Sequence, residues 1–152
     1  GRITVDRPTL LVTEIMYSHK NDMLIIWAGT NDGIETYGIE NTFANIDNMI
    51  AFIGHSRYIV VGMTAYNNGM HSIDTINSKF AQKYGSHFIN LRRYIELYGL
   101  SDNNLSDDSH DTYNDPAIPD ALFADGIHFN RYGYYSVAKC LYLFGKEKGW
   151  FN

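Results

Sequence analysis

The stretch Met23–Asp32, MLIIWAGTND, decides the fold class of this 152-residue chain. Large apolar residues follow one another over Met23–Trp27, without the alternation typical of a strand that has one face in water. Such a run is typical of a strand that is covered on both faces, as in a parallel sheet. The turn-forming residues of Gly29–Asp32 then mark the end of the strand. The stretch therefore predicts a parallel strand with Asn31 and Asp32 just beyond its carboxyl end.

Further strands and helices are predicted to alternate along the rest of the chain. Apolar runs indicate buried strands at Tyr58–Gly62 and Phe88–Leu91. Apolar residues recur at helical spacing over Phe43–Ile53 and Ile73–Tyr84, and a last helical pattern begins at about Arg131. Strand–helix alternation of this kind is typical of an α/β fold with a parallel sheet and right-handed crossovers.

Two segments lie outside this alternation. A short strand at Arg2–Val5 and a helix ending near His19 are expected ahead of the first buried strand. Residues 101–120 are acidic and polar and contain two prolines, so a long loop is expected there. Its carboxylates could hold Ca²⁺, but the spacing and glycine of an EF-hand are absent, and a solvated lid is the preferred interpretation. The carboxylates concerned are Asp102, Asp107, Asp108, Asp111 and Asp115.

Composition narrows the classes of function. With 45% apolar and 19% charged residues, the chain is expected to form one globular domain over residues 1–152. A net charge of −5 argues against nucleic-acid binding, and no apolar run approaches the roughly 20 residues of a membrane span. The single cysteine, Cys140, excludes an internal disulfide and is expected to be a buried structural thiol. Because the chain begins with Gly1, we expect a cut or processed N-terminus.

Two motifs carry candidate chemistry. In Asp125-Gly126-Ile127-His128 the aspartate can hold the Nδ1–H of the imidazole, which leaves Nε2 as a base. At the end of the first buried strand, Asn31 can direct its amide at a developing oxyanion, and Gly29 allows a substrate to approach the backbone. Asp32 is expected to tie the loop through backbone amides. Because ligands of α/β sheets bind beyond the carboxyl ends of the strands, the two motifs are expected to converge.

Each motif also has a purely structural alternative. G-T-N-D and D-G are common turn sequences, and Asn130 could be only a helix cap. The pair Arg92–Arg93 fits a solvated helix start, and Tyr66–Asn68 could contact substrate or form a simple loop. The other histidines show no paired ligand spacing, so neither a metal nor a cofactor is predicted.

Together the motifs resemble those of the SGNH hydrolases, also called GDSL esterases and lipases. Gly29–Asp32 is similar to the G-x-N-D block of that family, and Asp125–His128 is similar to its D-x-x-H block. The residues Phe129–Tyr134 resemble the usual continuation after the histidine, and Phe88–Tyr94 resembles the segment between the blocks. The resemblance covers residues 23–150.

The resemblance implies a flavodoxin-like three-layer α/β/α fold and the hydrolysis of ester bonds, often O-acetyl groups on carbohydrates. It implies that His128 is the general base, that Asp125 orients it, and that Asn31 and Gly29 form the oxyanion hole. The implied partner is an acylated carbohydrate or another ester. A secreted, periplasmic or virion-associated setting is preferred over the cytoplasm.

The nucleophile of that family lies in a G-D-S block after the first strand, and this block is absent from the 152 residues. That first strand is central to the family's sheet, so a middle strand would be missing as well. The preferred interpretation is the C-terminal part of an SGNH-like domain whose serine lies on an upstream segment. The alternatives are a non-catalytic glycan-binding or assembly module with a degenerate SGNH fold, and an accidental similarity.

Overall fold

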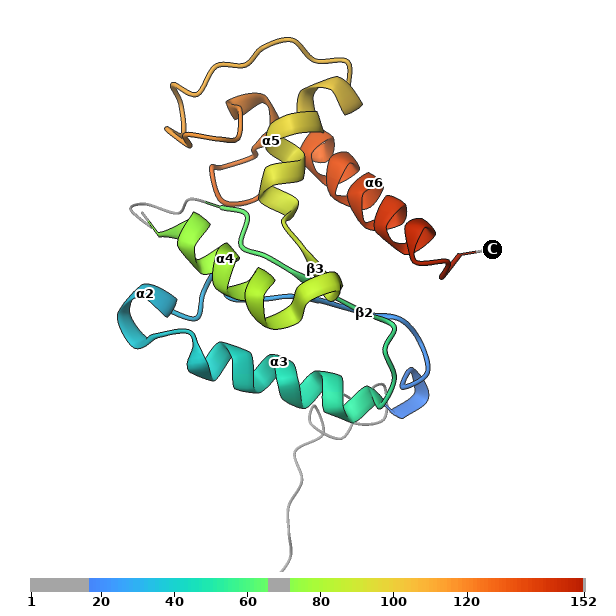
Figure 1. Ribbon diagram of the computed structural model, residues 1–152. Helices are drawn as coiled ribbons and strands as arrows, with labels where there is room; N and C mark the ends of the chain where they lie inside the picture. Colours follow the sequence, from blue (N-terminus) through green and yellow to red (C-terminus); the bar gives the residue numbers. More distant parts are fainter. Residues whose placement is uncertain (1–16, 66–71, 152) are drawn as a thin grey trace, which may run out of the picture.

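A computed structural model describes residues 17–65 and 72–151 as a mixed α/β arrangement of helices around a small sheet (Figure 1). Two short 3₁₀ turns, η2 and η3, accompany the helices and strands. In chain order the elements are β1 (Leu24–Trp27), α2 (Ile34–Tyr37), α3 (Glu40–Ile53), β2 (Tyr58–Val61), α4 (Ile73–Tyr84), η2 (Gly85–His87), β3 (Phe88–Ile89), α5 (Leu91–Asp102), η3 (Asp120–Leu122) and α6 (Arg131–Glu147).

The sheet has three parallel strands in the order β1-β2-β3. Ile25 pairs with Ile59 in the first ladder, and Val61 pairs with Ile89 in the second. The predicted parallel α/β sheet is therefore confirmed. Because the strands are parallel, their carboxyl ends meet at one edge, where Gly29 and Thr64 follow β1 and β2.

Helices cover the sheet from both sides. Ile26 and Val60 face a core shared with α2, α3 and α4, in which Phe80 is fully buried. Ile59 and Val61 face the opposite core, shared with α5, η3 and α6. The alternation of side chains along each strand explains this division, since neighbouring residues point to opposite faces.

The first strand is less covered than its sequence predicts. Ile25 is 40% exposed and Trp27 is 37% exposed, whereas Ile26 between them is buried. The expectation that this strand is covered on both faces is thus wrong for one face. The reason is position, because β1 lies at the edge of the described sheet, while the central strand β2 is covered on both sides.

Local residues determine where the helices α5 and α6 begin. The last helix begins at Arg131, as predicted, and the side chain of Asn130 caps it by accepting from the amides of Tyr132 and Gly133. The third predicted strand is shorter than expected, because the chain turns into α5 at Leu91. The side chain of Asn90 caps that helix by accepting from the amide of Arg93.

The expected solvated loop is only partly solvated. The helix α5 continues to Asp102, whose carboxylate receives hydrogen bonds from Tyr94, Ser136 and Lys139. Asp115 is buried in a salt bridge with Arg92. The remaining carboxylates of the predicted lid are exposed, namely Asp107, Asp108 and Asp111.

Several other expectations have a clear outcome. Cys140 is buried. This burial, and to a lesser extent the negative charge of the nearby Asp102, raises the pKa of its thiol to about 12. Within residues 17–65 and 72–151, none of the helices combines the length and apolar character that a membrane crossing requires. The predicted strand Arg2–Val5, most of the helix before His19, and Tyr66–Asn68 lie outside the described residues.

Candidate functional site

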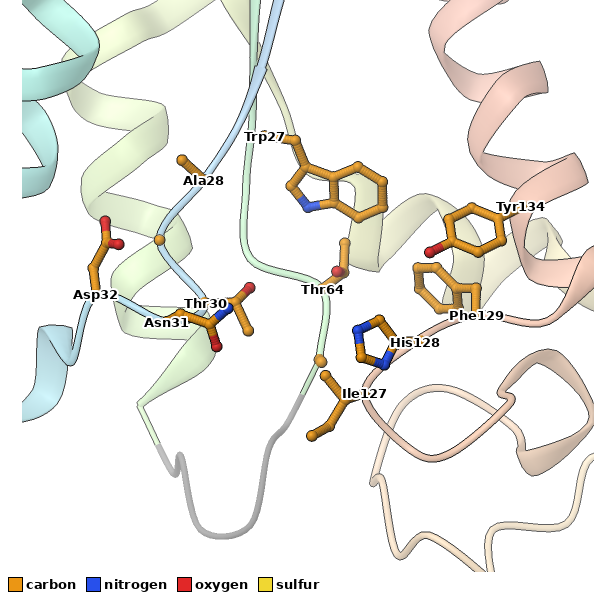
Figure 2. A pocket seen from close by; sticks show the side chains of 12 residues that line it. Trp27, Ala28, Thr30, Asn31, Asp32, Thr64, Ile127, His128, Phe129 and Tyr134 are labelled. Carbon is orange, nitrogen blue, oxygen red and sulfur yellow. The ribbon is translucent and has the colours of Figure 1, made fainter. Parts of the chain in front are cut away.

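A cavity of about 370 Å³ opens at the carboxyl ends of β1 and β2 (Figure 2). It brings together three of the four predicted site residues, namely Gly29, Asn31 and His128, which are far apart in sequence. Asp125, the fourth, stands behind His128 as its hydrogen-bond partner. The cavity is lined by Trp27, Ala28, Gly29, Thr30, Asn31, Asp32, Thr64, Ala65, Ile127, His128, Phe129 and Tyr134.

His128 is presented by a tight turn. Phe123 and Phe129 form an antiparallel bridge, and the amide of Ala124 donates to the carbonyl of His128 at 2.8 Å. Gly126 closes the turn with a φ of +82°, a backbone conformation that residues with a side chain adopt only with strain. The residues Asp125–His128 therefore form a compact loop between the two residues of the Phe123–Phe129 bridge, shortly before α6 begins.

The predicted dyad is formed. Asp125 Oδ2 lies 2.8 Å from His128 Nδ1, while Oδ1 accepts from the amides of His128 at 2.6 Å and Ile127 at 3.0 Å. The hydrogen bonds from the His128 amide and ring, with that from the Ile127 amide, lower the pKa of Asp125 to about 2. A carboxylate held in this way keeps its charge at neutral pH, and it can orient the imidazole and stabilise its protonated form.

A His–Asp pair at this spacing is not specific by itself. His19 Nδ1 lies 2.7 Å from Asp22 Oδ2, again three residues apart and on the surface. That second pair lies outside the cavity that Asn31 and His128 share. The position at the ends of the strands, and not the pairing alone, distinguishes the Asp125–His128 dyad.

The G-T-N-D loop is shaped by its glycine. Gly29 is buried with a φ of +114°, and a Cβ there would lie 3.3 Å from the side chain of Ile34. The expected role of Asp32 is different in the structure. Its carboxylate accepts from the hydroxyl of Thr42 on α3 at 2.7 Å and points away from His128 (Figure 2). Asp32 thus ties the loop to a helix through a side-chain contact.

The cavity includes residues that sequence reasoning did not single out as site residues. The rings of Trp27, Phe129 and Tyr134 gather on one side of it, and Asn31 lies on the other side (Figure 2). Trp27 and Tyr134 are partly exposed, and Phe129 is buried against both. In a chain with twelve tyrosines an aromatic residue carries little signal, and only nearness to the two motifs could have indicated them.

The cavity lacks a serine and is open to water. Among the described residues that line it, only Thr30 and Thr64 carry an aliphatic hydroxyl, and none of the nine serines of the chain is among them. The side chain of His128 is 69% exposed. Catalytic dipoles act most strongly where water is excluded, so the described residues form an incomplete, open arrangement.

Replacing Gly126 with alanine is expected to disturb the dyad. The new Cβ would meet the ring of Tyr113 at 2.9 Å and would also require a left-handed backbone. Gly54 is the matched control, because it has a φ of +67° and a Cβ added there would meet nothing within 4 Å. Left-handed strain costs about 1–2 kcal/mol in either variant, and Gly126→Ala should cost measurably more in urea unfolding. Equal destabilisation would contradict the contact with Tyr113.

Within the part of the chain that the structure describes, no group of three or more histidine, cysteine or acidic side chains could hold a metal ion. Comparisons with models of protein families, with curated proteins and with solved structures found no match to this chain.

Proposed function

We propose that this chain is the part of an SGNH-type serine esterase that carries the base and the oxyanion hole. The observation that carries the proposal is the shared cavity of Gly29, Asn31 and His128, with Asp125 oriented behind the imidazole. The substrate is an acyl ester, O-acetyl on a carbohydrate being preferred. The nucleophilic serine lies on an upstream segment that these 152 residues do not include.

The proposed reaction has two stages. The serine oxygen attacks the acyl carbonyl carbon while His128 Nε2 takes the serine proton, and Asn31 and the Gly29 amide stabilise the oxyanion. The C–O bond to the sugar then breaks, and the sugar oxygen leaves with the proton from His128. Water next attacks the acyl carbon while His128 takes its proton; the bond to the serine oxygen breaks, the serine oxygen takes that proton from His128, and the carboxylic acid is released.

The uncovered side of β1 leaves room for a further strand and helix beside the described residues. Ile25 and Trp27 pair in register with Ile59 and Val61, so they share the sheet face that α5 and α6 cover elsewhere. Among the described strands β1 has a neighbour on one edge only. A parallel strand on the free edge, followed by a helix, would cover both features, because parallel sheets are normally covered on both faces. Such a strand would complete the flavodoxin-like sheet that the resemblance implies.

The proposal is tested on the longer gene product that includes the sequence upstream of Gly1. A fluorophosphonate probe should label one serine outside residues 1–152, and the protein should hydrolyse a small acetyl ester. Asn31→Ala should lower kcat by about 10²–10³-fold, because one oxyanion donor is lost. Asn48→Ala is the control, since Asn48 is exposed on α3 and outside the cavity. Full activity of the Asn31→Ala variant would show that Asn31 does not stabilise the oxyanion.

A second candidate function is glycan binding without chemistry. It is favoured by the exposed rings of Trp27 and Tyr134 in a cavity without a serine, since aromatic faces are suited to packing against sugars. In that case the longer protein would show no labelled serine and no ester hydrolysis. Added acetylated oligosaccharide would instead change the tryptophan fluorescence, and Trp27→Ala would abolish this change.

A further inference from the structure

The segment Gly62–Ala65 lies beyond the end of β2, and its last two residues, Thr64 and Ala65, line the cavity. All four residues are buried, and the amide of Gly62 makes the last ladder contact, to the carbonyl of Ile89 at 3.0 Å. The neighbouring strand β3 ends at Ile89, and the chain continues into α5 at Leu91. Buried backbone groups need hydrogen-bond partners, so the partners of Met63 and Thr64 must come from elsewhere.

Because β3 ends at Ile89, two buried side chains supply the hydrogen bonds that a longer β3 would have made. Asn77 on α4 accepts from the amide of Met63 at 2.7 Å and donates to its carbonyl at 2.9 Å. Arg92 on α5 donates through Nη1 to the carbonyl of Thr64 at 2.9 Å. The wall of the cavity at Thr64 is thus held by side chains from two helices.

Arg92 also binds the loop that precedes the dyad. Its Nη1 and Nη2 donate to the two oxygens of Asp115 at 2.9 and 2.8 Å, and both side chains are almost fully buried. Asp115 Oδ1 accepts in addition from the amides of Ala117 and Ile118. One guanidinium therefore joins the Thr64 wall to the loop over residues 115–118.

That loop continues to the turn that carries His128. Asp120 accepts from the amides of Thr112 and Tyr113, and the hydroxyl of Tyr113 donates to the carbonyl of Ala124 at 3.0 Å. Ala124 is the residue directly before Asp125. A continuous series of contacts therefore links Arg92 to the dyad on one side and to Thr64 on the other.

We infer that Arg92 is a positioning residue, which together with Asp115 holds the Thr64–Ala65 wall at a fixed place relative to His128. A bidentate fork suits this task, because it fixes orientation as well as distance. A lysine at the same position would keep the charge but could not hold Thr64 and both oxygens of Asp115 in one plane. The inference rests on the proposed function only where it treats this wall as part of the substrate cleft.

Hydrogen exchange of the chain, followed by mass spectrometry or NMR, tests the inference with Arg92→Lys. Amides of residues 63–65 and 117–118 are expected to exchange at least ten-fold faster, while those of β1 and α3 keep their rates. Arg93→Lys is the matched control, because Arg93 is the adjacent residue and pairs with Glu96 on the surface. Unchanged exchange at 63–65, or an equal increase along the whole chain, would overturn the inference.

A second variant and a second readout keep the two proposals apart. If Arg92→Lys does not fold, Asp115→Asn, which keeps the side-chain shape, is judged by the same exchange pattern. In the serine-bearing protein Arg92→Lys should lower kcat/KM at least ten-fold with an unchanged pH profile, and equal values for Arg92→Lys and Arg93→Lys would count against the inference. If the wild-type protein shows no esterase activity, the proposed function fails, while the exchange pattern still decides the role of Arg92.

Discussion

Replacing His128 with alanine in the serine-bearing protein is expected to lower kcat for a small acetyl ester about 10⁴-fold, the upper range for general acid–base catalysis. Without the imidazole the described lining keeps one carboxylate, that of Asp32, which accepts from Thr42 and points away from His128. The fold should be retained, because the side chain of His128 is exposed on the turn. Steady-state kinetics and circular dichroism of the variant measure both effects.

The chain provides a close control for this experiment. His19 forms a surface pair with Asp22 at 2.7 Å, so His19→Ala removes a similar His–Asp contact outside the cavity. Activity of His19→Ala should equal that of the wild type. A His128→Ala variant with full activity would contradict the proposed mechanism.

The pH profile of the wild type gives an additional check. Hydrogen bonds from the amide and ring of His128, and from the amide of Ile127, lower the pKa of Asp125 to about 2. Any stability that this carboxylate contributes is therefore present above its unfolded pKa, about 3.9, and is lost as the pH falls through about 2. Protonation of Asp125 should therefore not limit activity between about pH 4 and 9.

Replacing Asp115 with alanine is expected to destabilise the fold by about 3–5 kcal/mol, as is typical when one partner of a buried ion pair is removed. The guanidinium of Arg92 would stay buried without its counter-charge, and the amides of Ala117 and Ile118 would lose their acceptor. Urea unfolding followed by circular dichroism measures the change in the free energy of unfolding.

The control is the neighbouring pair on the surface. Glu96→Ala removes the partner of Arg93, and an exposed pair of this kind contributes only about 0–1 kcal/mol. If Asp115→Ala costs no more than Glu96→Ala, the buried pair does not stabilise the fold as argued.

The wild type should also respond to acid through this pair. Burial alone would raise the pKa of Asp115, but the hydrogen bonds from Arg92 and from two backbone amides outweigh it, and the pKa is lowered. The contribution to stability is therefore complete above the unfolded pKa of about 3.9 and is lost as the pH falls below it.

The elements that sequence reasoning predicts correctly are those whose signals are local. The apolar run of β2, the turn residues after β1 and the cap at Asn130 each act within a few positions, and the structure confirms them. The dyad is predictable for the same reason, since Asp125 and His128 are three residues apart. For α5 the sequence indicates only a helix start at Arg92–Arg93, because its first residue, Leu91, continues the apolar run of β3.

The sequence by itself determined the parallel α/β sheet, the local dyad and the end of β1 where Asn31 lies. Only the tertiary structure decided that Arg92 and Asp115, 23 positions apart, form a buried pair, whereas the sequence favoured solvated side chains at both positions. The tertiary structure also decided that one face of β1 is exposed, because an apolar run in the sequence is compatible with one covered face or with two. The physical reason is that burial and ion pairing depend on which distant elements pack together, and local sequence patterns contain no information about such long-range contacts.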